Sequence, residues 1–537
     1  MNMRATIRAS LILGALWAGA IPAFGATCES LAALKLPDTT ITSAQTIAAG
    51  AFAPPGAPNP GAAARFFNTV PAFCRVTAEA KPTPDSDIKI EVWMPVAGWN
   101  GKYSGNGNGG FAGMMNYQGL GEAVSNGFAS AGTDTGHSGG ATDASWAIGH
   151  PEKVIDFGYR GVHEMTVKAK AIIHAYYGDG PTHSYFASCS NGGRQALMEA
   201  QRFPDDYDGI IAGAPANYWT HLLAAGIWDM QALLVDPAAY IPASKVPAIG
   251  AAALAACDAK DGVGDGIIND PRECGFDPAV LLCDGAESNS CLTVAQVAGF
   301  KKVQAGPRNS KGEQIFPGYV PGGEQGGNGW PTWITGSAPG KSLQFAFSNG
   351  FFANVVYGNP LWDYKKFNFD KDLNSVDDRE GPILNAIDPN LKAFKARGGK
   401  LIVYHGWSDS AIEPVNAINY YNSVVAAMGG QNVNAFLRLY MASGMQHCGG
   451  GPGPSSFGQG GPGPGDAQHN IYTAIEQWVE KGVAPDRIVA TKYVNDQDPT
   501  QGVKMTRPLC PYPQAAKYKG TGDTNDEANF ICVAGKK

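Results

Sequence analysis

The chain has 537 residues, a formal net charge of −7 and only 16% charged residues, which excludes the basic surface that nucleic acid or an anionic membrane attracts. Its length is sufficient for one large or two smaller domains with a sizeable core. The 70 glycines and 37 prolines indicate many turns and loops on a rigid scaffold.

The first 25 residues have the features of a secretory signal peptide. Arg4 and Arg8 precede a short apolar run at 11–21, and small residues suited to cleavage follow at 23–26. This run is too short to cross a bilayer, and no later apolar run reaches about 18 residues. We therefore expect an exported protein, periplasmic or extracellular, without a membrane-spanning segment.

Predicted strands and helices alternate along the first part of the mature chain. Residues 87–96 read as a strand, 119–133 as a helix and then a short strand, and 158–177 as a helix. Another strand, 184–189, leads into a tight turn and a helix, and 208–216 is a short apolar strand. This alternation indicates an α/β fold with a mostly parallel sheet.

The pattern changes in the middle of the chain. Residues 217–397 are rich in Gly, Pro, Trp and Phe and contain four cysteines and an acidic loop. Buried strands return at 398–409 and 436–448. We interpret 217–397 as a lid domain inserted between two parts of one α/β domain, 26–216 and 398–537.

The segment SYFASCSNGG at 184–193 reads as a strand, a tight turn and the start of a helix. This is the shape of a nucleophile elbow, whose usual pattern is G-x-S-x-G. Ser188 stands where the first glycine is expected, and Cys189 precedes the candidate nucleophile Ser190. A serine in such a turn is often only a turn residue, but the strand, the helix and the cysteine favour a nucleophile.

An activated serine needs a base, and the base needs a carboxylate that orients it. In α/β-hydrolases these follow in the order Ser, acid, His. Asp409 follows a late strand, and His447 lies in the loop after the next one. Asp409 could instead cap a helix, and His469 is the weaker candidate base. The sequence thus predicts an α/β-hydrolase fold with a large inserted lid.

Ten cysteines in an exported chain suggest disulfides, although spacing alone does not give their connectivity. Proximity makes three local pairs plausible: Cys257–Cys274, Cys283–Cys291 and Cys510–Cys532. Cys189 precedes Ser190 and Cys448 follows His447. If the side chains of Ser190 and His447 meet, these two cysteines come close enough for a disulfide that would tie the loop of the base to the elbow.

Three motifs together resemble the tannase and feruloyl esterase family, which includes terephthalate monoester hydrolases. They are CSNGGRQ at 189–195, YHGWSD at 404–409 and GMQHC at 444–448, and the C-terminal segment 506–532 is also similar. The resemblance extends over nearly the whole mature chain. It implies the Cys189–Cys448 bridge, and it makes Cys28–Cys74 and the three local pairs the remaining bridges.

An oxyanion hole needs backbone N–H groups. The residue after the nucleophile, Asn191, is expected to supply one. The glycine-rich loop 105–110 is expected to supply the other, and comparison with the family points to Gly109 or Gly110.

The lid contains CDAKDGVGDGI at 257–267, where three carboxylates lie within eight residues. Close like charges favour a cation, and oxygen ligands in a flexible loop suit calcium, although the spacing is not that of an EF-hand. The loop resembles the lid calcium site of the family. That resemblance implies side-chain ligands from Asp258, Asp261 and Asp265 and carbonyl ligands from Val263 and Ile267. No organic cofactor is expected.

The family resemblance implies small esters of aromatic acids as substrates, with Trp330, Trp333, Ala411 and Ile412 as candidate pocket residues. Enzymes of the family that cleave terephthalate monoesters hold the free carboxylate with a lid arginine. Between residues 301 and 378 the only arginine of this chain is Arg308, and Lys341 lies nearer the tryptophans in the sequence.

We therefore expect a feruloyl- or galloyl-type acyl group, with a terephthalate monoester as the alternative. A different class of function also remains, a catalytically inactive, calcium-stabilised binding protein. The sequence leaves the oligomeric state open.

Overall fold

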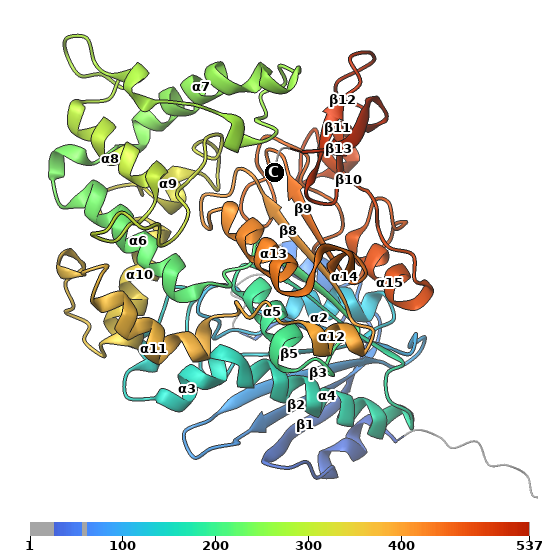
Figure 1. Ribbon diagram of the computed structural model, residues 1–537. Coiled ribbons are helices and arrows are strands. Elements are labelled where there is room, and N and C mark those ends of the chain that lie inside the picture. Colours follow the sequence, from blue (N-terminus) through green and yellow to red (C-terminus); the bar gives the residue numbers. More distant parts are fainter. Residues whose placement is uncertain (1–25, 56–61, 536–537) are drawn as a thin grey trace, which may run out of the picture.

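The computed structural model describes residues 26–55 and 62–535, so the predicted signal peptide lies outside the described residues. A nine-stranded sheet with the order β1-β2-β3-β5-β4-β6-β7-β8-β9 forms the centre of the molecule, and helices cover it (Figure 1). Its strands are β1 (Thr39–Ile47), β2 (Phe73–Ala80), β3 (Ile88–Pro95), β4 (Lys102–Asn106), β5 (Ala129–Thr133), β6 (His183–Cys189), β7 (Gly209–Gly213), β8 (Lys400–Gly406) and β9 (Leu437–Ala442).

The sheet is mixed but mostly parallel. The neighbours from β5 through β4, β6, β7 and β8 to β9 all pair in parallel. The pairs β1–β2, β2–β3 and β3–β5 are antiparallel. The predicted α/β-hydrolase type of sheet is therefore confirmed, while β1 and β2, which add an antiparallel edge, were not predicted from the sequence.

Successive side chains of the parallel strands face opposite sides of the sheet, and both sides are buried. In β6, Phe186 packs into the cluster that contains Leu197 of α5 and Val424 of α13. Its neighbour Tyr185 packs into the cluster that contains Ile475 of α15. The covering helices are α2 (Tyr117–Ser125), α4 (Gly161–Tyr177), α5 (Asn191–Arg202), α13 (Val415–Met428) and α15 (Ile471–Lys481).

The segment between β7 and β8 is largely helical and is drawn green to orange in Figure 1; we call the part of it that lies on one side of the sheet the lid. Its last part instead packs in the central core, where Leu391 and Phe394 are buried with Phe186 of β6. Part of the lid has its own core, in which Ile249, Phe300 and Trp330 are buried. The α-helices of the segment are α6 (Trp219–Leu234), α7 (Val246–Cys257), α8 (Val294–Ala305), α9 (Trp330–Trp333), α10 (Leu343–Gly350), α11 (Asp372–Leu384) and α12 (Lys392–Ala396). Short helices elsewhere are α1 (Ala62–Phe67), α3 (Pro151–Ile155) and α14 (Gly430–Asn434).

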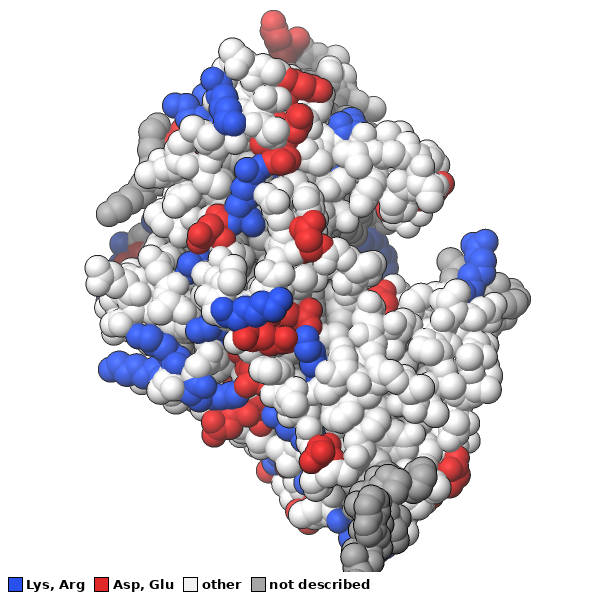
Figure 2. Space-filling view, turned by 90° about the vertical axis from the view of Figure 1, so that its right-hand side faces the viewer, with Lys and Arg blue, Asp and Glu red and all other residues white. Residues whose placement is uncertain are grey.

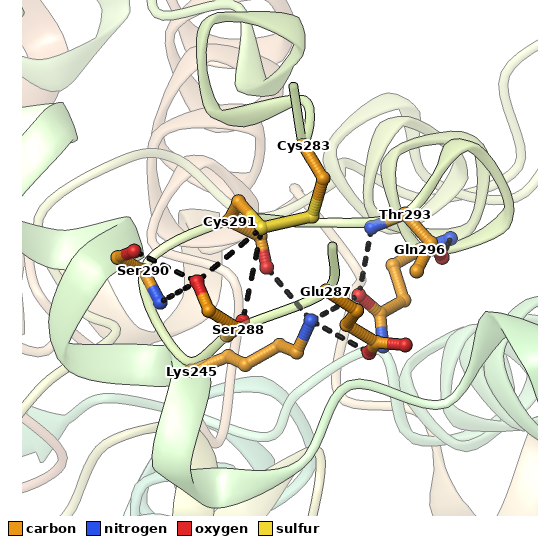
Figure 3. Close-up of a disulfide and its surroundings, with 8 residues drawn as sticks. All are labelled: Lys245, Cys283, Glu287, Ser288, Ser290, Cys291, Thr293 and Gln296. Atoms are coloured by element: carbon orange, nitrogen blue, oxygen red, sulfur yellow. Dashed lines mark hydrogen bonds and ion pairs between the residues drawn. A yellow bond between two sulfur atoms is a disulfide. The ribbon is translucent and has the colours of Figure 1, made fainter. Parts of the chain in front are cut away.

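All ten cysteines are paired, and the predicted connectivity is confirmed. The five disulfides are Cys28–Cys74, Cys189–Cys448, Cys257–Cys274, Cys283–Cys291 and Cys510–Cys532. Figure 3 shows the Cys283–Cys291 bridge, which closes a short loop before α8. The buried ammonium of Lys245 donates to the Cys291 carbonyl at 2.7 Å and to Gln296 Oε1 at 3.0 Å, so it anchors this loop to the rest of the lid.

After α15 the chain forms two antiparallel pairs, which were not predicted. They are β10 (Ile488–Tyr493) with β11 (Val503–Leu509), and β12 (Gln514–Tyr518) with β13 (Phe530–Ala534). Arg507 of β11 forms an ion pair with Asp265 of the lid. The C-terminal strands therefore hold the acidic lid loop in place.

On the face drawn in Figure 2, Lys and Arg are interspersed with Asp and Glu and most of the surface is uncharged. Among the described residues, one segment, Pro237–Asp261, is long and apolar enough by composition to cross a membrane. The structure divides this segment into α7 and shorter helical turns, and Val246, Ile249 and Ala253 of α7 pack in the lid core. One face of α7 thus packs in the lid core, while 39% of the apolar window as a whole is buried.

Candidate active site

Ser190 lies at the sharp turn between β6 and α5. Its backbone has φ 67° and ψ −125°, a conformation that residues other than glycine rarely adopt. Two hydrogen bonds hold the turn: Ser190 N–H donates to the Gly213 carbonyl at 2.9 Å, and Ala216 N–H donates to the Ser190 carbonyl at 3.1 Å. This strained strand-to-helix turn is the backbone of a nucleophile elbow, and Ser190 lines a pocket in front of it.

The serine at position 188 makes glycine necessary elsewhere in the elbow. A Cβ at Gly192 would collide with Ser188 Oγ, and a Cβ at Gly193 would collide with the Gly213 carbonyl. Asn-Gly-Gly after the nucleophile therefore lets the first turn of α5 pack directly on β6 and β7. This is why the departure from G-x-S-x-G at position 188 still gives an elbow.

The loop after β4 is fixed against the elbow helix by side-chain amides. Asn108 N–H donates to Gln195 Oε1 at 2.9 Å, and Gln195 Nε2 donates to Asn108 Oδ1 at 3.2 Å. Gly110, in this loop, lines the same pocket as Ser190 and Asn191, whereas Gly109 does not. Of the two glycines considered from the sequence, Gly110 is thus the one beside the nucleophile.

A buried arginine, Arg194, orients the start of α5. Its Nε donates to Asn191 Oδ1 at 2.8 Å, and its guanidinium also donates to the carbonyls of Phe157 and Gly158. Burial lowers the pKa of Arg194 to about 9, which still leaves it charged at neutral pH. Arg194 thereby connects Asn191 to the rest of the fold.

Asp409 and His447 are bonded to each other at the ends of β8 and β9. His447 Nδ1 lies 2.9 Å from Asp409 Oδ2, and the Asp409 side chain is fully buried. Asp409 Oδ1 accepts from the backbone N–H groups of Ala411 at 2.8 Å and Ile412 at 3.1 Å. The carboxylate is thus held on both oxygens and fixes the tautomer of the imidazole, with Nε2 left to accept a proton.

A second histidine, His405 of β8, also contacts Asp409. Its Nε2 lies 3.1 Å from Asp409 Oδ2 and 3.2 Å from the Ile412 carbonyl. Burial alone would raise the pKa of Asp409, but the charge of His447 and hydrogen bonds from both histidines outweigh it and hold that pKa well below its usual range. Asp409 is therefore an anion that can stabilise a charged His447.

The disulfide and the lid restrain the loop of His447. The Cys189–Cys448 bridge has a Cα–Cα distance of 5.9 Å and joins the neighbours of Ser190 and His447. Trp333 of α9 packs edge-to-face on the His447 imidazole, with 5.2 Å between ring centroids. His469, the weaker candidate base, instead pairs with the exposed Asp466 and is not part of this pocket.

The pocket in front of Ser190 has about 490 Å³ of unfilled space, including its open mouth. Its walls are mostly apolar, and none of the lining residues is a lysine or arginine. The residues that line it are Gly110, Ser190, Asn191, Ala216, Trp219, Leu222, Leu223, Trp333, Gln344, Phe347, Ser348, Ala411, Ile412 and His447.

The pocket contains some of the residues considered from the sequence and not others. Trp333, Ala411 and Ile412 are in its lining, but Trp330 is not. The expectation for Trp330 is corrected: its ring is 2% exposed and stacks on Phe300 in the lid core, with 4.8 Å between centroids. Burial against Phe300 leaves no part of Trp330 for a substrate.

The acidic lid loop folds around its own carboxylates. Asp258 Oδ1 and Oδ2 accept from the N–H groups of Asp265, Gly266 and Ile267, at 3.0–3.3 Å. Burial raises the pKa of Asp261 and Asp265, and their neighbouring carboxylates raise it further, while Arg507 opposes this for both. The loop therefore concentrates negative charge that a single arginine partly offsets.

Several residues that build this site were not identified from the sequence. Arg194 and Gln195 belong to the CSNGGRQ motif, so their position directly after its glycines could have marked them as residues of the site. His405 belongs to the YHGWSD motif, four residues before Asp409, so it too had a usable local signal. The roles of Asn108 and Gln344 depend on contacts with segments far away in the chain. No local pattern marks those contacts.

Comparison with known proteins places this geometry in context. A family model described as tannase and feruloyl esterase matches residues 74–533. An uncharacterized esterase of Xanthomonas campestris pv. campestris is 44% identical, over 99% of this chain and 95% of its own. A mono(2-hydroxyethyl) terephthalate hydrolase of Piscinibacter sakaiensis is 34% identical, over 87% and 85%.

A solved structure has the same fold over nearly its whole length. The crystal structure of feruloyl esterase B from Aspergillus oryzae matches with a TM-score of 0.85 and 30% identity, over 94% of this chain and 99% of that one. Each of these relatives is named as an esterase or hydrolase. They therefore give no support to the alternative function considered from the sequence, a catalytically inactive binding protein.

Proposed function

Since the chain belongs to the tannase and feruloyl esterase family of carboxylic ester hydrolases, we propose that it is an exported serine esterase that cleaves esters of uncharged or phenolic aromatic acids through an acyl-enzyme. The main support is the hydrogen bond between His447 and Asp409, with His447 in the wall of a pocket that Ser190 also lines. Five disulfides support export, because such bonds persist in oxidising compartments.

In this mechanism Ser190 Oγ attacks the ester carbonyl while His447 Nε2 takes its proton. The negative charge on the carbonyl oxygen is stabilised by backbone N–H groups of Asn191 and Gly110. His447 returns the proton to the departing alcohol, and the acyl group stays on Ser190. Water, activated by the same imidazole, then releases the acid. Asp409 keeps the imidazole oriented and stabilises its charged form throughout.

The test is the Ser190→Ala variant with an aryl ester substrate such as p-nitrophenyl butyrate. Loss of the nucleophile should lower kcat by at least about 10³-fold without changing the melting temperature. Ser125→Ala is the matched control, because Ser125 is exposed on α2 and should leave kcat unchanged. Full activity in purified Ser190→Ala would contradict the assignment.

The lining of the pocket supports an acyl group without a free carboxylate. A terephthalate monoester carries such a carboxylate, and burying it needs a cationic partner. Arg308 and Lys341, the lid cations considered from the sequence, are exposed and outside the lining. We expect kcat/KM to be higher for methyl ferulate or methyl gallate than for mono(2-hydroxyethyl) terephthalate. A clear preference for the terephthalate ester would reverse this choice.

We also propose that the lid loop at 258–267 holds a structural calcium ion. Side-chain oxygens of Asp258, Asp261 and Asp265, with the carbonyls of Val263 and Ile267, would form an all-oxygen donor set of the kind that calcium prefers. The raised pKa values of Asp261 and Asp265 support a cation there, because it would relieve the repulsion between these buried carboxylates. Calcium would supply charge compensation to the lid and no step of ester cleavage.

Calcium removal is tested by melting in EDTA and after calcium is added back. Chelation should lower the melting temperature, and Asp258→Asn should reduce the response to calcium. Asp277→Asn, a change of an exposed lid carboxylate outside the loop, is the control. Absence of calcium by elemental analysis, together with an unchanged melting curve in EDTA, would contradict this proposal.

A further inference from the structure

Two polar residues of α10 line a pocket whose other lid residues are apolar. Gln344 and Ser348, one helical turn apart, belong to the lining together with Phe347. The polar groups near Ser190 are used in the reaction, but Gln344 and Ser348 come from the lid and have no part in it. Their helix packs closely on α6, where a Cβ at Gly226 would meet Gln344 Cγ at 3.0 Å.

The amide of Gln344 has a defined orientation. Its Nε2 donates to Asp229 Oδ2 at 2.8 Å and to the Tyr319 hydroxyl at 3.1 Å. These two bonds use both hydrogens of the amide. In the part of the chain that the structure describes, no donor is bonded to Gln344 Oε1, so a hydrogen-bond acceptor remains available in the pocket lining.

The groups that hold the amide are themselves buried and acidic. Asp229 is 3% exposed and Glu413 is 1% exposed, and Tyr319 lies beside both. Burial raises the pKa of both carboxyls well above the usual range, and the charge of Asp229 raises that of Glu413 further. Neither carboxyl lines the pocket itself, and no lysine or arginine is among the lining residues, so Gln344 is the polar group of this end that a substrate can reach together with Ser348. This end of the pocket lacks a cationic partner for a carboxylate, and the free acceptor of Gln344 suits a hydroxyl donor.

We propose that Gln344 is a specificity-determining residue, whose Oε1 accepts a hydrogen bond from a ring hydroxyl of the acyl group. The inference rests on the proposed aromatic esterase function and specifies its substrate class as phenolic acids. A buried acceptor that stays unpaired is costly, so an analogue without the hydroxyl is discriminated against. The simpler role for Gln344, as a partner that only satisfies the buried Asp229, does not produce such discrimination.

The experiment compares three methyl cinnamates that differ only at the para position: hydroxyl, methoxy and hydrogen. Hydroxyl and methoxy have similar electronic effects on the ester, but only the hydroxyl donates a hydrogen bond. Wild-type enzyme should prefer the hydroxyl ester over the methoxy ester by about tenfold in kcat/KM. Gln344→Met, which keeps the length of the side chain and removes Oε1, should reduce that ratio to near one.

The matched control is Gln231→Leu. Gln231 also uses its amide to donate two hydrogen bonds inside the lid, to the carbonyls of Tyr364 and Phe367, but it does not line the pocket. Its loss should leave the ratio unchanged even if total activity falls. A ratio that persists in Gln344→Met overturns the inference.

Wild-type enzyme alone also tests the inference, should Gln344→Met fail to fold. Equal kcat/KM for the hydroxyl and methoxy esters would overturn it while leaving the esterase function intact. If the enzyme hydrolysed none of the three esters, that result would instead contradict the proposed function.

Discussion

Replacing Cys189 and Cys448 together by alanine removes the bridge between the elbow and the loop of the base. The bridged residues are 259 positions apart in the chain. The chain-entropy relation gives a stabilisation of about 5.6 kcal/mol for a loop of that length at 25 °C. Over a mature chain of about 500 residues, with an unfolding entropy of about 2.1 cal/mol/K per residue, this corresponds to a fall in Tm of about 5 °C.

The matched control is the double alanine variant of Cys283 and Cys291. This bridge spans only 8 residues, for which the same relation gives about 2.5 kcal/mol and about 2 °C. Both variants are melted at one fixed scan rate, and kcat is measured at 25 °C, where both are folded. Only loss of the Cys189–Cys448 bridge should also lower kcat, by about tenfold to hundredfold, because it loosens the alignment of Ser190 with His447.

Two results would refute this reasoning. If the Cys189/Cys448 variant lost no more stability than the Cys283/Cys291 variant, loop length would not govern the contribution of these bridges. If its kcat equalled that of wild type, the bridge would not be needed to align the imidazole. Its bond to Asp409 and its contact with Trp333 would then be sufficient.

Three further changes test the electrostatics of the site and the lid. Asp409→Asn should lower kcat by about 10³–10⁴-fold with little change in KM, since an amide favours the wrong tautomer of His447; near-normal kcat would exclude Asp409 as the acid. His405→Phe should lower kcat about tenfold, because Asp409 loses one of its donors; an unchanged kcat would show that the donor is dispensable. Burial raises the pKa of Glu324 to about 7. The folded state therefore retains a proton that the unfolded chain releases above pH 4–5, and the free energy of unfolding falls as pH rises from there through 7. Glu324→Gln should therefore gain about 2–3 kcal/mol over wild type between pH 5 and pH 8 in urea unfolding, and a pH-independent difference would contradict the shifted pKa.

The sequence was sufficient for those parts of the protein that depend on local pattern and chain order. Strand and helix periodicity around Ser190 predicted the elbow, and the order Ser, Asp, His selected Asp409 and His447. Cys189 and Cys448 could be paired because each adjoins a residue expected in the same site. Such inferences work because neighbours in the chain must remain neighbours in space.

The fold contains elements that the pattern did not reveal. The antiparallel strands β1 and β2 and the two C-terminal strand pairs lack the strand–helix alternation that marked the rest of the sheet. β1 pairs with β2, and β2 pairs with β3 of the central sheet. The C-terminal strands pair with one another. One face of α7, within the apolar segment Pro237–Asp261, similarly becomes buried only because the lid supplies an apolar surface for it.

The tertiary structure alone decided which lid side chains reach the pocket. Trp330 and Trp333 are three residues apart and equally plausible as pocket residues, yet Trp330 is buried against Phe300 and Trp333 packs on His447. Gln344 is oriented by Asp229 of α6, 115 residues earlier in the chain. The sequence predicted the chemistry that we propose for Ser190. Which lid side chains line the pocket depends on how distant lid segments pack, because side-chain direction and hydrogen-bond partners are set by contacts that no local pattern encodes.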